Sequence, residues 1–364
     1  MEKYNKMAVK KICFVSLNNL YLSPYLEKYT SIMDCRIDVI YWNRHSIKED
    51  LDAATIHPFN FKTSEDASKL EKLRGYMCFK KFASKIIKKN KYDGVVLLQT
   101  SCGILLSSIL KTKYKYKYIL DIRDYTMENN IIFYIIEKAI IKYSFCSVIS
   151  SEGFKEFLPI HNYVLVHNDV KIDEKTIERF AKRKNSNKRI VISCIGLIRF
   201  YDQNIKVIEK FKNDDRFLLK FIGKGSYSLI EYCKINNIKN VKLIDRFPQE
   251  KTIEYYYDTD IINNLYGNMT PLLDYALSNK LYYAAKLYIP ILVCPGTYME
   301  YVSTKYSFGY SFDIEDPNAC DKLFNYYKSN SWIDLKENCD KFMKTVELDN
   351  SLFAQRVKNF VKKV

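Results

Sequence analysis

The sequence predicts an α/β fold built from two doubly wound, Rossmann-like domains. Short apolar runs of strand length alternate with segments whose apolar residues recur at helical spacing, a pattern typical of parallel sheets covered by helices on both faces. This alternation occurs twice, before and after a polar stretch at residues 171–187. A chain of 364 residues is also long enough for two domains that each bury a core.

The expected elements follow the chain in order. In the first half, strands are expected at residues 11–17, 37–42, 95–99, 116–121, 146–149 and 164–166, and helices at 24–32, 67–90 and 131–143, with one more after Gly103. Residues 45–65 are polar and are expected to be irregular. In the second half, strands are expected at 190–195, 217–222, 241–243, 261–265 and 291–294, and helices at 205–211, 226–234, 249–257 and 278–287.

The change in composition sets the expected domain boundaries. We expect an N-terminal domain at residues 1–170, a linker at 171–187 and a C-terminal domain at 188–345. Residues 352–360 carry apolar side chains at helical spacing. Residues 346–364 are therefore expected to form a helix that packs back on the N-terminal domain.

Composition limits the classes of function. Hydrophobic residues make up 48% of the chain, which argues against a disordered protein, and a formal net charge of +16 favours anionic partners such as nucleotides, nucleic acid or anionic lipid. The 10 cysteines form no CxxC pair and several lie in apolar runs, so we expect a reducing compartment and no zinc site. Neither a signal peptide nor a transmembrane helix is expected.

The most informative stretch is IVISCIGLIRF at residues 190–200. A buried strand breaks at Gly196, Arg199 follows three residues later, and a helical pattern comes next. Glycine lets the backbone approach a ligand closely, the helix start offers free N–H groups, and arginine binds phosphate oxygens in pairs. The pattern indicates a phosphate site; the alternative is an ordinary strand-to-helix turn with a surface arginine.

A second turn of this kind favours the phosphate site. Gly223-Lys224-Gly225 also follows a strand and precedes a helix, although it matches neither a Walker loop nor GxGxxG. Loops at the carboxyl ends of neighbouring strands converge in a doubly wound sheet. Gly196, Arg199, Gly223 and Lys224 are therefore expected to face one ligand.

A third helix start lies at Ser278-Asn279-Lys280. Serine is a good N-cap, and the N–H groups beyond it favour an anion. The alternative is a capped helix with no ligand.

Four stretches carry a resemblance to a known family. They are YILDIRD at 118–124, CSVISSEGFKEFL at 146–158, ISCIGLIR at 192–199, and a longer set at 243–257, 260–265, 278–282 and 289–293. In this order and spacing the chain resembles glycosyltransferases of the GT-B fold, in particular the large retaining family four and its capsule and surface-polysaccharide relatives. The resemblance covers most of the chain.

The resemblance implies two Rossmann-like domains that face each other across a cleft, with the donor held by the C-terminal domain and the acceptor by the N-terminal domain. It implies that no metal or other cofactor is needed, because cations and helix dipoles stabilise the leaving nucleoside diphosphate. The residues it places at the donor are Gly196 and Arg199 at the diphosphate, Gly223 and Lys224 beside it, Arg246 and Phe247 at the base, and Ser278, Asn279 and Lys280 at the phosphates. Asn18 and Asn19 replace the glycine-rich loop on the acceptor side.

The chain departs from the family at several positions. The two glutamates that relatives usually carry around the third helix fall at Tyr275 and Tyr283, and the usual glycine near the end of that helix falls at Tyr288. Asp274 is the candidate that replaces the ribose-binding glutamate. Lys206 is the candidate for the lysine that often follows the diphosphate arginine.

Asp121, Arg123 and Asp124 cluster at a strand end and are the candidate catalytic residues. A carboxylate there is suited to orient or deprotonate an acceptor hydroxyl. The alternative is an Asp–Arg pair that fixes the following loop.

Asp258-Thr259-Asp260 is a DxD sequence, which binds metal in another glycosyltransferase fold. Here it falls between a helix and a strand, so we expect no metal site, although Mg²⁺ sites often need few protein carboxylates.

The lysines at 80–91 and 111–117 are expected to form a solvated basic face. The alternatives, in order of preference, are a contact with an anionic membrane surface and a contact with nucleic acid.

Together these observations predict a bacterial, cytoplasmic glycosyltransferase, peripheral on the inner face of the plasma membrane. It is expected to move a sugar from a nucleotide-sugar donor to a growing lipid-linked surface polysaccharide of the cell envelope, of the capsule or O-antigen type. A sugar-nucleotide epimerase of the same fold and a non-catalytic nucleotide- or glycan-binding relative are the alternatives. Nucleic acid is not an expected partner.

Overall fold

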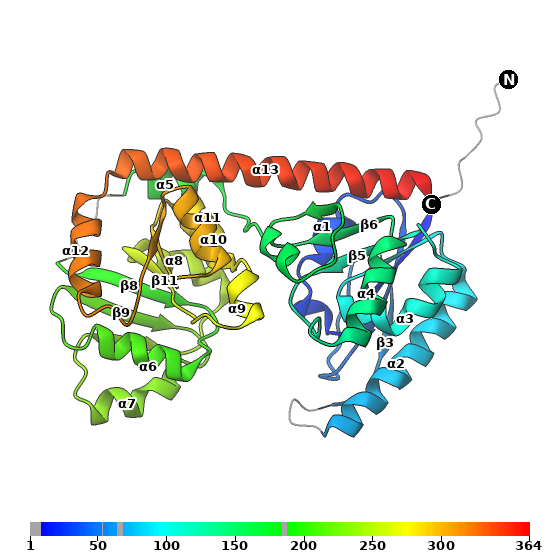
Figure 1. The fold of residues 1–364 in the computed structure, drawn as a ribbon, viewed down its shortest axis with the longest axis horizontal. Coiled ribbons are helices and arrows are strands. Elements are labelled where there is room, and N and C mark those ends of the chain that lie inside the picture. The colour runs from blue at the N-terminus through cyan, green and yellow to red at the C-terminus, as the bar shows by residue number, and fades with distance from the viewer. Residues whose placement is uncertain (1–8, 53, 64–67, 184–187) are drawn as a thin grey trace. The chain divides into compact units, whose positions relative to one another are not determined.

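The computed structural model describes residues 9–52, 54–63, 68–183 and 188–364. The chain divides into two compact units, Met1–His167 with Leu348–Val364 (unit 1) and Asn168–Glu347 (unit 2). Each unit is a parallel sheet with helices packed on it (Figure 1). The predicted α/β class with two Rossmann-like units is therefore confirmed.

The sheet of unit 1 has the strand order β3-β2-β1-β4-β5-β6-β7, and all its neighbouring strands are parallel. The chain runs outward from β1 to β3 and then returns to β4 on the other side of β1. The carboxyl ends of β1 and β4 therefore flank a point where the strand order reverses, the usual place for a ligand in such sheets. The strands are β1 (Lys11–Ser16), β2 (Arg36–Trp42), β3 (Ala54–Phe59), β4 (Gly94–Leu97), β5 (Tyr118–Ile122), β6 (Cys146–Ile149) and β7 (Tyr163–Leu165).

The helices of unit 1 begin at residues that the sequence marks as caps. The Ser68 hydroxyl accepts the Glu71 N–H at 3.2 Å at the start of α2, and the Asn130 side chain accepts two N–H groups at the start of α4. The helices are α1 (Leu26–Thr30), α2 (Lys69–Asn90), α3 (Thr100–Thr112) and α4 (Ile131–Lys142), with short 3₁₀ turns at Leu20–Leu22 and Glu152–Glu156.

The sheet of unit 2 has the order β10-β9-β8-β11-β12-β13, again parallel, so its strand order reverses between β8 and β11. The strands are β8 (Ile190–Ile195), β9 (Phe217–Ile222), β10 (Val241–Ile244), β11 (Ile261–Asn264), β12 (Ile291–Val293) and β13 (Gly309–Ser311). The helices are α5 (Glu174–Ala181), α6 (Tyr201–Lys210), α7 (Ile230–Ile235), α8 (Thr252–Tyr257), α9 (Pro271–Tyr275), α10 (Asn279–Leu287), α11 (Tyr298–Lys305) and α12 (Ala319–Ser329), with 3₁₀ turns at Ser226–Leu229 and Gln249–Lys251.

The last helix, α13 (Trp332–Lys363), contributes to the cores of both units. In unit 2, Phe342 lies against the rings of Tyr306 and Phe308 at 5.2 and 5.3 Å between centroids. In unit 1, Phe353 meets Tyr29 at 5.0 Å, and Phe360 is fully buried. The helix is much longer than the one expected at 346–364, and its last turns pack in the core of unit 1.

Two expectations were wrong. Residues 45–65 were expected to be irregular, but 54–59 form β3, an edge strand whose half-buried side chains show no apolar alternation. The linker expected at 171–187 contains α5, which is capped by Asp173 and buries Phe180 in the core of unit 2; residues 184–187 of that linker lie outside the described residues. In both segments tertiary packing decides the structure, because the local pattern is weak. None of the described helices combines the length and the apolar character needed to cross a bilayer.

Glu137 on α4 is fully buried, and neither of its carboxylate oxygens has a hydrogen-bond partner among the described residues. Burial, and then the nearby charge of Glu128, raise the pKa of Glu137 from 4.5 to about 8. The folded state therefore holds this proton more tightly than the unfolded chain does. Its contribution to stability is full below about pH 4.5 and is lost as the pH rises to about 8.

We therefore expect the Glu137→Gln variant to gain stability over the wild type as the pH rises from 5 to 8. The difference in unfolding free energy should grow by several kcal/mol at most, because one pKa unit corresponds to about 1.4 kcal/mol. Denaturant unfolding at a series of pH values measures it. Glu156→Gln removes an exposed carboxylate and is the control. A difference that does not change with pH would contradict the assignment.

Candidate functional site

The two predicted glycine turns of unit 2 touch each other at the carboxyl ends of β8 and β9. The strands pair up to Ile195 opposite Ile222, and the next residue on each is a glycine with positive φ, +117° at Gly196 and +131° at Gly223. A Cβ on Gly223 would lie 1.8 Å from the carbonyl oxygen of Gly196. No side chain fits there, so the close approach of the two turns requires glycine.

The space beyond Gly196 is open, since a Cβ built on this residue would meet no atom within 4 Å. The neighbouring turn has no such open space, because it packs against the first turn. The Ile198 N–H donates to the Lys224 carbonyl at 2.9 Å, and a Cβ on Gly225 would lie 2.4 Å from the Ile198 carbonyl oxygen. The turns therefore form a rigid floor whose Gly196 side is accessible to a ligand.

Arg199 and Phe200 connect the first turn to α6. Arg199 is exposed, and no described carboxylate lies within ion-pair distance of it. Its carbonyl accepts the Asn204 side-chain amide at 2.6 Å. Phe200 adopts the left-handed conformation, with φ of +61°, which is rare for a side chain of this size. Such conformations are often held in place at binding sites.

Tyr266, which follows β11, links this turn to α10. Its ring lies 5.5 Å from the ring of Phe200, and its hydroxyl accepts a hydrogen bond from the Lys280 ammonium. Tyr266 was not among the predicted site residues. Its position after a buried strand, on the far side of the strand-order reversal, is the signal that could have identified it.

Lys280 is a buried cation, 5% exposed, on the second residue of α10. Its Nζ also lies 3.5 Å from the Cys194 sulfur, and no carboxylate among the described residues pairs with it. Burial by itself lowers the pKa of Lys280, but the interactions with Cys194 and Tyr266 outweigh burial and raise it. The side chain therefore stays protonated at neutral pH, and a buried ammonium without a counterion attracts an anion.

The start of α10 is built as the sequence predicts. The Ser278 hydroxyl accepts the Lys280 N–H at 3.2 Å and donates to the Asn264 side chain at 2.8 Å, which anchors the helix start at the end of β11. Asn279 is the first residue of the helix. The first-turn N–H groups therefore start at the same sheet edge as the glycine turns.

The other predicted donor residues lie further along this edge. Arg246 and Phe247 follow β10, whose last carbonyl, at Ile244, accepts the Gly223 N–H at 2.8 Å. Arg246 is exposed, and Phe247 packs on Tyr255 at 4.9 Å.

Asp274 and Tyr283, the positions related to the ribose contact, both have structural partners. Asp274, on α9, accepts the Met269 N–H at 2.8 Å and so holds the loop between β11 and α9. Tyr283 stacks on the buried Tyr256 at 4.8 Å. The geometry gives Asp274 a loop-fixing role, and its ribose contact stays a prediction.

A cavity of about 210 Å³ opens beside α6, at the ends of β11, β12 and β13. Lys206 and Gln203 line it from the helix, and Asp313 and Glu315 line it from the loop after β13. Lys206 therefore points into a polar cavity of unit 2, and a diphosphate contact for it stays a prediction.

In unit 1, Asp121 and Arg123 form a buried ion pair at the end of β5. The Arg123 guanidinium meets both carboxylate oxygens at 2.6 and 2.7 Å, and the Tyr29 hydroxyl donates to the same carboxylate at 2.7 Å. Asp121 is 0% exposed. Of the two interpretations of this cluster, the geometry favours the loop-fixing pair for Asp121 and Arg123, and it leaves Asp124 as the exposed carboxylate.

Asn19, predicted on the acceptor side, is also buried. Its amide donates to Asn43 at 2.8 Å and to Glu49 at 2.7 Å, so it ties the turn after β1 to the loop after β2. Asn18 is half-buried and hydrogen bonds through its backbone to Ser16. A cavity of about 630 Å³, lined by Asn43 and Glu49, lies next to this tie.

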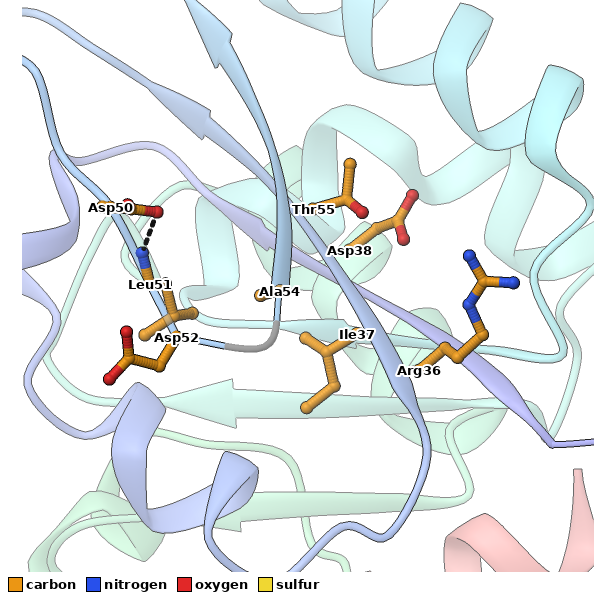
Figure 2. Close-up of a pocket in the computed structure, with 8 residues that line it drawn as sticks. All are labelled: Arg36, Ile37, Asp38, Asp50, Leu51, Asp52, Ala54 and Thr55. Carbon is orange, nitrogen blue, oxygen red and sulfur yellow. Dashed lines mark hydrogen bonds between the residues drawn. The ribbon is translucent and has the colours of Figure 1, made fainter.

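Figure 2 shows a different pocket, of about 400 Å³, at the amino ends of β2 and β3. Asp38, Asp50 and Asp52 line it, but Figure 2 shows the Asp38 carboxylate pointing away from the other two, and Asp38 pairs with Lys11 at 3.2 Å. The predicted acceptor residues follow the carboxyl ends of the strands, so this pocket lies at the opposite edge of the sheet.

The DxD residues also lie at an amino edge, before β11. Asp260 is buried and accepts the Val191 N–H at 2.8 Å, whereas Asp258 is exposed. The two carboxylates therefore differ in burial, and no cluster of three metal-ligating side chains occurs within the described ranges.

The sequence matches no protein-family profile and no curated protein. Its structure resembles a glycosyltransferase from Rickettsia africae, with a TM-score of 0.68 at 12% identity over 98% of this chain and 100% of that chain. It also resembles HepE from Anabaena in complex with UDP, with a TM-score of 0.66 at 9% identity over 95% of this chain and 98% of that chain. A third similar structure is sucrose-phosphate synthase from Thermosynechococcus elongatus, with a TM-score of 0.66 at 10% identity over 95% of this chain and 98% of that chain. The likeness, at such low identity, establishes the fold: the chain has the fold of the GT-B glycosyltransferases.

Proposed function

We propose that the chain is a glycosyltransferase that takes a sugar from a nucleotide-sugar donor held by unit 2. The observation that carries this proposal is a set of cations at one sheet edge that form no ion pair with any carboxylate among the described residues. Arg199, Lys224 and the buried Lys280 stand around two interlocked glycine turns and the start of α10. An edge of this kind suits a diphosphate, which is bound by cations, by helix N–H groups and by exposed backbone.

The chemistry follows from the charges. When the sugar leaves, the nucleoside diphosphate gains negative charge, and fixed cations that are already desolvated stabilise it without reorganising. Lys280 is suited to this role because it is buried and its ammonium is held by Tyr266. The reaction then needs no metal ion and no other cofactor.

The donor nucleotide that we propose to test first is UDP, because the HepE structure holds UDP in the same fold. We further propose that the acceptor is a growing lipid-linked surface glycan of the capsule or O-antigen type. The basic segments 80–91 and 111–117 support a contact with an anionic membrane surface on the cytoplasmic side. Membership of retaining family four is part of the same proposal.

Arg199→Ala and Lys280→Met are expected to abolish the rise in unfolding temperature that UDP, within a panel of nucleoside diphosphates, gives the wild type. A ligand at about a hundred times its dissociation constant stabilises the native state by about 2.7 kcal/mol. Lys280→Met should leave the ligand-free stability unchanged or higher, because it removes a buried charge without a counterion.

Arg189→Ala is the matched control, since Arg189 is an exposed arginine of unit 2 paired with Asp215. It should keep the response to UDP. No response of the wild type to any nucleoside diphosphate would contradict the proposed donor site.

Turnover is expected to be unchanged when divalent metal ions are removed with a chelator, because protein cations balance the charge of the leaving group. Release of nucleoside diphosphate from the donor measures turnover. If activity disappears with the chelator and Mg²⁺ restores it, the metal-free mechanism is wrong.

Asp124→Asn and Asp121→Asn are expected to act differently. Asp124 is exposed, so its change should lower turnover and leave stability within about 0.5 kcal/mol. Asp121→Asn breaks a buried ion pair, so it should lower the free energy of unfolding by about 3–5 kcal/mol. Turnover and denaturant unfolding of both variants test this, and equal turnover of Asp124→Asn and wild type would remove Asp124 from the catalytic site.

A further inference from the structure

Four lysines meet around one pocket at the amino edge of the sheet in unit 1. The pocket has a volume of about 190 Å³ and lies between the ends of α2 and α3, two helices that pack side by side (Figure 1). Lys88 and Lys91 line it from the end of α2, and Lys113 and Lys117 from the segment after α3. We call this set the lysine pocket.

The floor of the lysine pocket is apolar and aromatic. Ile87, Tyr92, Ile109 and Tyr114 form it, and all four are buried. The four lysines are exposed and stand at the rim. A buried floor with a cationic rim is a defined recess and not merely a solvated charged face.

No carboxylate lines the lysine pocket, and none of its lysines takes part in an ion pair within the part of the chain that the structure describes. Two acidic side chains lie close to the pocket, Asp93 beside Tyr92 in the sequence and Asp38 hydrogen bonded to Tyr92, and both have other partners. Asp93 accepts the Lys11 N–H at 2.8 Å, and Asp38 accepts the Tyr92 hydroxyl at 2.7 Å and pairs with Lys11.

Helix dipoles explain part of this arrangement, because lysines are favoured near helix C-termini. They do not explain why two helices direct their lysines to one recess, where like charges repel each other. Exposed Lys111, Lys115 and Lys142 add further positive charge near these helix ends. An anion in the recess offsets this repulsion, and a positive surface raises the local concentration of anions.

Lysine ammoniums act as point charges and do not impose the planar geometry that arginine imposes on carboxylates. A tetrahedral phosphate therefore satisfies several of them at once. The recess, with a volume of about 190 Å³, has room for a phosphate or pyrophosphate group.

We propose that the lysine pocket binds a phosphate-bearing anion, supplied either by a free phosphate compound or by the headgroup of an anionic phospholipid. The pocket lies before β4 and β5, at the edge of the sheet opposite to the residues that follow β1 and β5. It is thus a second anion site, separate from the predicted acceptor residues. Where its ligand is a lipid headgroup, it deepens the membrane contact proposed above for segments 80–91 and 111–117 and rests on that part of the proposed function.

The test uses the full chain in an Arg199→Ala background, so that the proposed donor site does not mask a second anion site. One arm titrates sodium pyrophosphate by calorimetry. The other measures co-sedimentation with phosphatidylcholine vesicles that contain or lack phosphatidylglycerol. The pocket variant is Lys88→Gln with Lys113→Gln. The matched control is Lys234→Gln with Lys239→Gln, which removes the same charge from exposed sites of unit 2.

We expect at least a tenfold loss of affinity in the pocket variant and less than a twofold loss in the control, in whichever arm shows binding. Pyrophosphate binding identifies a soluble ligand, and binding only to the phosphatidylglycerol vesicles identifies a lipid headgroup. The proposal is overturned if neither probe binds, or if the pocket and control variants lose affinity equally. Restoring Arg199 tests the donor site separately, so failure of one site is distinguishable from failure of the other.

Discussion

The contact between Gly196 and Gly223 is the constraint on which the candidate site depends. Parallel pairing brings the ends of β8 and β9 into register, and the turns beyond them occupy space that no Cβ can share. The Ile198–Lys224 hydrogen bond then fixes the backbone beside them, and Phe200 starts α6 from a left-handed residue. Arg199 follows directly from the first of these turns, whereas Tyr266 and α10 are positioned by the end of β11. Because backbone atoms of the two turns form this surface, the charged side chains around it remain available to bind a ligand.

Two buried cations, Arg123 in unit 1 and Lys280 in unit 2, differ in their partners. In unit 1, Arg123 is neutralised by Asp121, and both groups are removed from solvent, so the pair serves the loop that follows β5. In unit 2, the Lys280 ammonium contacts the Tyr266 hydroxyl and the Cys194 sulfur, and no carboxylate among the described residues pairs with it. Burying a charge without a counterion costs stability, and proteins keep such groups where a ligand supplies the missing charge. This contrast is the reason for proposing a donor-binding role for Lys280 and a structural role for Asp121.

Helix α13 shows how a single element serves two cores. Its first half carries Phe342 into unit 2, and its second half carries Phe353 and Phe360 into unit 1. From the sequence, only the apolar spacing of the second half was visible. Strand prediction succeeded where the apolar runs are mostly buried: residues 146–149, 190–195 and 217–222 have the expected bounds. The sequence did not predict the strand β3 or the helix α5, because their half-buried or charged residues are held by neighbours that are distant in sequence.

The sequence by itself determined the α/β class, the two sheets and the glycine turns, because these rest on local apolar periodicity and on the backbone freedom of glycine. It also located Arg199 and Lys280, because a cation after a strand or at a helix start is a local pattern. Only the tertiary structure decided which of these charges have partners. It joined Tyr266 and Cys194 to Lys280, buried Asp121 against Arg123, and directed the lysines of α2 and α3 to one recess. Such pairings arise between segments far apart in the chain, where the packing of helices and strands, and not residue spacing, sets which side chains meet.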